Sequence, residues 1–108
     1  MSPAGATRPR EGPEWEAEIL GRFMPRGRLL QIPAAESRRL VVLRFLAELF
    51  QPSRRYTEAE VNEVLRQYHP DVASLRRFLV DAELLQRHDG IYWRTGTIPH
   101  PLLVGADG

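Results

Sequence analysis

All 15 basic residues of this 108-residue chain are arginine, and lysine is absent. A guanidinium group is always charged, and its planar set of donors can grip a phosphate or the O6 and N7 atoms of guanine. Lysine is missing from the tails as well, which is more simply a compositional bias of the source than a signature of nucleic-acid binding. The position of each arginine is therefore more informative than its identity.

The charge is distributed unevenly along the chain. Residues 22–55 contain eight arginines and two acids, a net charge of +6. Residues 56–94 contain five arginines and seven acids, a net charge of −2. Because the whole chain has a formal charge of only +1, the fold must assemble locally any surface that engages several phosphates.

We predict a surface for double-stranded DNA from the arginines that flank the expected helices. Arg76 and Arg77 are expected to read bases, since a guanidinium can bind guanine with two hydrogen bonds. The alternative is that these two side chains pair with Asp81, Glu83 and other acids on a solvated helix face. The full predicted set is Arg38, Arg39, Arg54, Arg55, Ser74, Arg76, Arg77, Arg87 and Arg94.

Other kinds of site have little support in the sequence. The absence of cysteine excludes disulfides, zinc ribbons and thiol catalysis. His69, His88 and His100 share no metal-ligand spacing. The serines occur in no nucleophile elbow, and there is no glycine-rich phosphate loop. We therefore predict no enzyme, no metal and no cofactor.

The two ends of the chain are expected to be tails around one domain at 14–95. Residues 1–13 are rich in proline and lack the apolar centre of a signal peptide. Residues 96–108 contain prolines and glycines, although the apolar residues Ile98 and 102–104 could dock on the body or on a partner. No apolar run approaches the roughly 18 residues that span a membrane, so we expect a cytoplasmic protein with no membrane contact.

Periodic apolar residues predict four helices between the tails, at 13–23, 36–50, 57–68 and 71–84. A short extended run is expected at 28–32. The helix at 36–50 has a wide apolar arc, which is typical of the central helix of a small core. Thr57 and Glu60 have the spacing of a capping box, and Asn62 is expected to make a polar contact that holds the turn. Asp71 suits the positive end of the next helix dipole.

A hairpin is predicted after the last helix. Asp89-Gly90 lies between the short runs 85–88 and 91–95, and this dipeptide favours a two-residue turn with positive φ at both positions. Such a turn places His88 opposite Ile91 and Leu85 opposite Arg94. Each face of the ribbon then carries both apolar and polar side chains, so the alternation leaves the buried face open.

The order of these elements predicts an α+β, mainly helical, winged helix-turn-helix fold. It has a three-helix core, a C-terminal hairpin as the wing and an extra N-terminal helix. The helix at 71–84 is then the recognition helix. The alternative is a small α+β interaction domain that uses the same elements for packing.

Several separate blocks of the sequence also resemble a known family. They are Gly27-Arg28-Leu29 with Ile32-Pro33, residues 56–62, Leu75-Arg76-Arg77 and Tyr92-Trp93-Arg94. Over residues 23–94 the chain resembles an uncharacterised bacterial domain family that occurs alone or fused to ArsR-type transcriptional regulators. The resemblance implies a winged-helix-like fold and an association with transcription, and it implies no functional residues.

Two functions follow as hypotheses. The first is a DNA-binding or transcription-regulatory module that acts with a partner domain or as a homodimer, because one such module offers few base contacts. The second is a protein-interaction module in transcription, with the same fold and no direct DNA contact.

Overall fold

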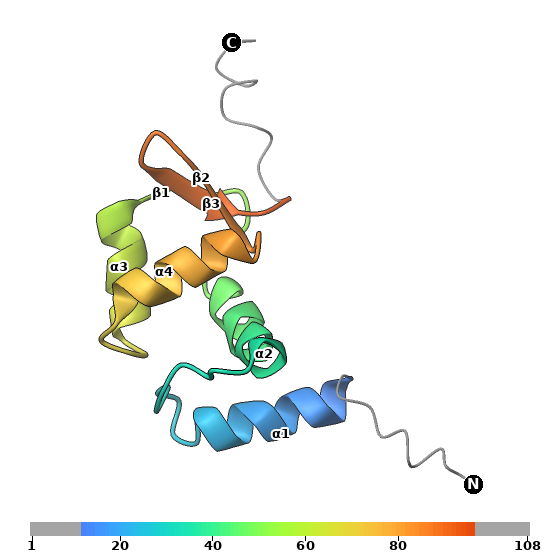
Figure 1. Ribbon diagram of the computed structural model, residues 1–108. Coiled ribbons are helices and arrows are strands. Elements are labelled where there is room, and N and C mark those ends of the chain that lie inside the picture. The colour runs from blue at the N-terminus through green and yellow to red at the C-terminus, as the bar shows by residue number, and fades with distance from the viewer. Residues whose placement is uncertain (1–11, 97–108) are drawn as a thin grey trace, which may run out of the picture.

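The computed structural model describes residues 12–96, so the predictions for residues 1–11 and 97–108, including His100, lie outside the described residues. The architecture is α+β and mainly helical, as expected (Figure 1). In chain order the elements are α1 (Pro13–Phe23), α2 (Glu36–Ala47), β1 (Tyr56–Thr57), α3 (Glu58–Arg66), α4 (Val72–Asp81), β2 (Leu85–His88) and β3 (Ile91–Arg94).

The three strands form one antiparallel sheet in the order β1-β3-β2. The predicted hairpin register is confirmed, with Leu85 opposite Arg94 and His88 opposite Ile91. Asp89 and Gly90 adopt φ values of 52° and 79°, which a two-residue hairpin turn requires. Strand β1 was not expected, because two residues are too short to show alternation. It brings the segment before α3 against the hairpin through Tyr56 and Tyr92.

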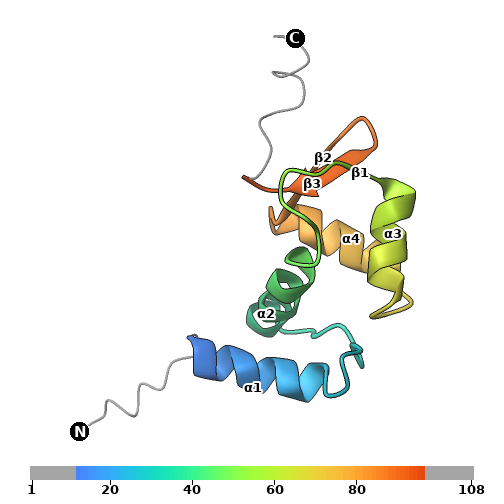
Figure 2. The same ribbon diagram turned by 180° about the vertical axis from the view of Figure 1, so that it is seen from behind.

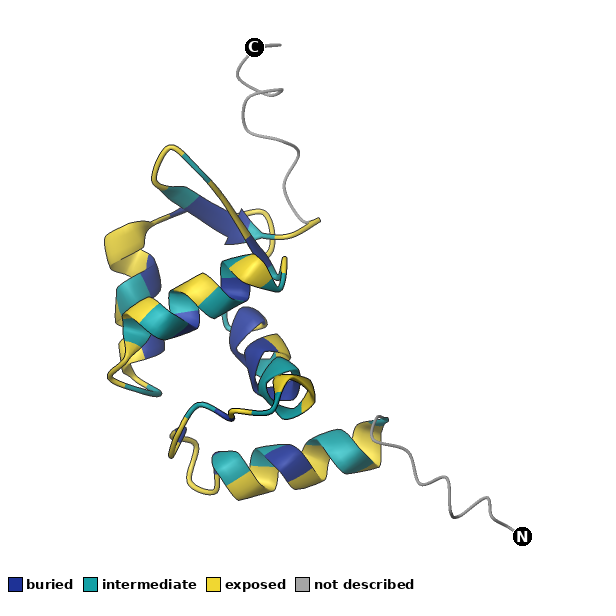
Figure 3. Cartoon of the chain, in the orientation of Figure 1, coloured by how far each residue is buried: buried dark blue, intermediate teal, exposed yellow. Residues whose placement is uncertain are grey.

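One hydrophobic core joins α2, α3, α4 and the sheet, as the burial colours in Figure 3 show. Helix α2 supplies its largest share, and its wide apolar arc is confirmed as the centre of the core. The core residues with no exposed surface are Val42, Leu46, Phe50, Val61, Leu65, Leu75 and Leu79. Burial of this apolar surface supplies most of the driving force that fixes α4 against α3.

Two predicted helices end earlier than expected. Helix α2 ends at Ala47, and the next backbone bonds tighten to three-residue spacing, which still carries Phe50 into the core. Helix α4 ends at Asp81 because Glu83 adopts a left-handed φ of 62°. The Leu84 amide then donates to the Leu79 carbonyl at 2.9 Å, the bond of a Schellman motif.

The extended run predicted at 28–32 is wrong as a strand. This segment consists of bends, and its backbone bonds reach separate partners. The Leu29 amide donates to the Tyr68 carbonyl and the Leu30 amide to the Phe23 carbonyl, both at 2.9 Å. Since no single neighbouring strand accepts these bonds, no ladder forms, and the segment ties α1 to the end of α3.

Helix α1 has the predicted bounds and packs on α2, away from the sheet in both views (Figures 1 and 2). Ile19 is its buried anchor. Glu16 lies 3.4 Å from Arg44 across the contact, an exposed ion pair that contributes little to stability. Within residues 12–96, no helix has the length and apolar character needed to cross a membrane.

Candidate nucleic-acid interface

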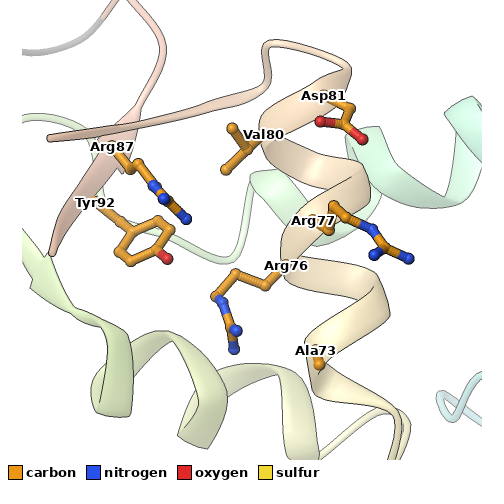
Figure 4. A pocket seen from close by; sticks show the side chains of 7 residues that line it. All are labelled: Ala73, Arg76, Arg77, Val80, Asp81, Arg87 and Tyr92. Carbon is orange, nitrogen blue, oxygen red and sulfur yellow. The ribbon is translucent and has the colours of Figure 1, made fainter.

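A surface hollow of about 520 Å³ lies between α4 and the hairpin. Figure 4 shows its lining, which is formed by Ala73, Arg76, Arg77, Val80, Asp81, Arg87 and Tyr92. The hollow therefore gathers three of the nine predicted DNA-binding residues, with one aspartate beside them. No other predicted arginine contributes to this lining.

The start of α4 is fixed by a side-chain cap. Asp71 Oδ1 accepts a hydrogen bond from the Ser74 amide at 3.1 Å. Hydrogen bonds from the Ser74 side chain and backbone lower the pKa of Asp71 below its ordinary value. Ser74, predicted as a DNA contact, thus has its polar groups engaged in the helix cap. The predicted role of Asp71 at the helix start is confirmed.

Arg76 is held by α3. Its Nη1 donates to Asn62 Oδ1, and its Nη2 lies 3.6 Å from Glu58 Oε2. Only 19% of the Arg76 side chain is exposed. The expected polar role of Asn62 is therefore a contact between the two helices of the helix-turn-helix pair. Arg76 does form the ion pair that the alternative hypothesis required, but with Glu58 rather than with Asp81 or Glu83.

The Glu58 carboxylate also contacts the sheet. Tyr92 donates from its hydroxyl to Glu58 Oε1 at 3.4 Å. Because Tyr92 is buried at the floor of the hollow, this contact links β3 to the first turn of α3. Glu58 thereby joins three elements through Arg76 and Tyr92, and the sequence gave no signal for this role.

Arg77 and Arg87 differ from Arg76. Both are exposed, and neither forms an ion pair with any acid in the described part of the chain. In Figure 4, Arg87 extends from the hairpin toward α4, whereas Arg76 turns toward α3 and Arg77 turns to the other side of α4. Two guanidinium groups from two elements are thus available to an external ligand.

The remaining predicted residues are placed elsewhere. Arg39 donates to the Pro33 and Ala34 carbonyls at 3.2 and 3.0 Å, and its guanidinium lies 4.4 Å from the Phe78 ring centre. Arg94 donates to the Phe50 carbonyl at 3.2 Å. These bonds fix the two arginines to loops that flank α2.

Arg54, Arg55 and Arg38 lie outside the hollow as well. Arg54 stacks on Tyr56, with 4.5 Å between its guanidinium carbon and the ring centre, and pairs with Glu60 at 3.7 Å. Arg55 is exposed, and Arg38 is half-buried at the start of α2. The +6 segment of the sequence therefore does not converge on the hollow.

The acids of α3 are all paired. Glu60 also completes the predicted capping box, accepting from the Thr57 amide at 2.9 Å while its own amide donates to Thr57 Oγ1 at 3.1 Å. The ion pairs are Glu58 with Arg76, Glu60 with Arg54, and Glu63 with Arg66. This pairing lowers the negative field that α3 projects beside the hollow.

Comparison with known proteins identifies the family and nothing finer. No curated protein and no solved structure matches the chain. Residues 28–94 match a family described as "uncharacterized protein conserved in bacteria (DUF2087)". The match covers more than half of the chain, from the α1–α2 connection through the end of β3. The chain therefore belongs to this bacterial family.

Proposed function

We propose that the protein is a winged-helix module that binds double-stranded DNA through α4 and the β2–β3 hairpin, and that it acts in transcription regulation. The order helix, strand, helix, helix, hairpin supports the winged-helix assignment, with α4 as the recognition helix and the hairpin as the wing. The sheet order β1-β3-β2 supports it too, because it attaches the wing to the strand before α3.

A single observation carries the proposal. Arg77 on α4 and Arg87 on the hairpin are exposed, line one hollow and have no acid partner among the described residues. A duplex that lies across α4 would meet both guanidinium groups, one suited to base edges and one to phosphate. The number of free arginines is small, so we expect modest affinity and a partner module or a second copy in the active form.

The experiment is a titration of a labelled random-sequence duplex, followed by fluorescence anisotropy at several salt concentrations. The wild type should bind at low salt and weaken as salt rises, because bound arginines release counterions. In R77Q/R87Q, the slope of log K against log salt should fall by about 1.8, at about 0.9 for each lost phosphate contact.

The matched control is R54Q/R66Q, which also removes two positive charges. Arg54 and Arg66 are paired with Glu60 and Glu63, so their loss should leave the slope near that of the wild type. No binding by the wild type at low salt would overturn the proposal. Equal losses in the two double variants would overturn the assignment of the surface.

A second candidate is a protein partner, favoured by the mixed charge of the same region. Asp81 lines the hollow, and Glu83 and Asp89 lie close in sequence to its α4 and hairpin walls. A protein surface with both charges would complement this pattern, whereas DNA would not. Under this candidate a defined complex should be weakened by both D81N and R77Q, while duplex binding is absent.

A further inference from the structure

We infer that Glu58 and Asn62 hold Arg76 off the DNA, so that Arg77 alone is the arginine of α4 that contacts bases and Arg76 is a positioning residue between α3 and α4. This inference rests on the proposed function. It separates two adjacent arginines that have the same chemistry in the sequence.

The contacts of Arg76 account for both ends of its guanidinium group. Nη1 is bound to the Asn62 amide oxygen, and Nη2 faces the Glu58 carboxylate at 3.6 Å. To reach a phosphate or a base edge, Arg76 would have to leave both partners. Asn62 is half-buried, so its oxygen would lose its protein donor at a site that water reaches only in part.

Glu58 adds a second obstacle. Its carboxylate is held toward Arg76 by the Tyr92 hydroxyl, which donates to Oε1 at 3.4 Å. Tyr92 is buried in the sheet and lines the hollow. A phosphate that approached Arg76 would therefore also approach a fixed negative charge.

Arg77 lies one residue further, about 100° around the helix. It is exposed and forms no ion pair with the described acids. Figure 4 shows the two side chains leaving α4 in different directions, with Arg76 toward α3. Removing the Glu58 charge should release Arg76 and add one phosphate contact.

A double-mutant cycle with wild type, E58Q, R76Q and E58Q/R76Q tests this inference. The measurement is again the salt slope of duplex binding. R76Q should keep the wild-type slope, and E58Q should steepen it by about 0.9, the value for one new phosphate contact. The steepening should disappear in E58Q/R76Q. E63Q is the control, because it removes another paired acid from the same helix and should leave the slope unchanged.

The outcomes separate this inference from the proposed function. If E58Q steepens the slope equally with and without Arg76, the effect is the loss of a repulsive charge and the inference fails. A slope that falls in R76Q means that Arg76 already contacts DNA, which also overturns it. If none of the four proteins binds a duplex, the inference fails together with the proposed function.

A measurement on the free protein checks the restraint itself. Relaxation of the arginine Nε–H groups by NMR should show an ordered Arg76 and a mobile Arg77 in the wild type. E58Q should make Arg76 mobile. Equal mobility of the two side chains in the wild type would contradict the restraint, whatever the DNA titration shows.

Discussion

Helices α3 and α4 are neighbours in the chain and in the core, yet they treat their charges differently. All three acids of α3 pair with arginines. On α4 only Arg76 forms an ion pair, whereas Arg77 and Asp81 form none with the described residues. The difference shows that an arginine count predicts little about binding, because the fold decides which guanidinium groups are already satisfied.

The largest expected effect separates the two faces of α4. Leu79 is completely buried, so L79A should lower the free energy of unfolding by about 3 kcal/mol through lost burial and a cavity. R77A, on the exposed face, should change it by less than about 0.5 kcal/mol. Urea denaturation of both variants measures this. A similar loss in R77A would mean that Arg77 is structural and would remove the contrast with Arg76.

The start of α3 gives the next effect. T57A removes the hydroxyl that accepts from the Glu60 amide and should destabilise the protein by about 1 kcal/mol. T57S keeps this oxygen and serves as the control, with a much smaller loss expected. If T57A and T57S lose the same stability, the capping box contributes nothing and the side-chain methyl of Thr57 is responsible.

The end of α4 carries a conformational strain that α3 lacks. Glu83 has a left-handed φ of 62°, which costs an L-residue with a side chain about 1 kcal/mol. E83G should therefore raise the free energy of unfolding by a similar amount. E83A removes the charge and keeps the strain, so a comparable gain in E83A would assign the effect to charge instead.

The smallest effect concerns the start of α4 and depends on pH. The folded-state pKa of Asp71 is lowered by its hydrogen bonds to Ser74. The stabilisation is therefore present above the unfolded pKa of about 3.9 and is lost as the pH falls through the lower folded value. D71N should show less loss of stability than the wild type between neutral pH and pH values below 3.9. Urea denaturation across this range measures it, and a constant difference between the two proteins would contradict it.

Local signals in the sequence predicted much of the fold. The Thr57 and Glu60 spacing, Asp71 and the Asp89-Gly90 turn each act within a few residues, and the structure confirms all three. Strand β1 escaped prediction because its pairing partner is distant in the sequence. The bounds of α4 were missed because any L-residue other than glycine gives little warning of a left-handed φ.

The candidate site was less predictable for the same reason. Asn62 stood out as a polar residue between apolar positions, but its bond to Arg76 depends on how α3 packs against α4. The predicted acid partners, Asp81 and Glu83, were close in sequence, whereas the actual partner Glu58 comes from another helix. Seven of the nine predicted contacts are held or placed away from the ligand-accessible pair Arg77 and Arg87.

The most direct test of the central claim is a map of where a duplex touches the protein. Amide and arginine Nε–H spectra should be recorded during titration with a short duplex at low salt. Shifts should concentrate on α4 around Ala73 and Arg77 and on the hairpin around Arg87, with Arg54 and Arg66 unaffected. Shifts confined to α1 and α2, or no shifts at all, would contradict the account.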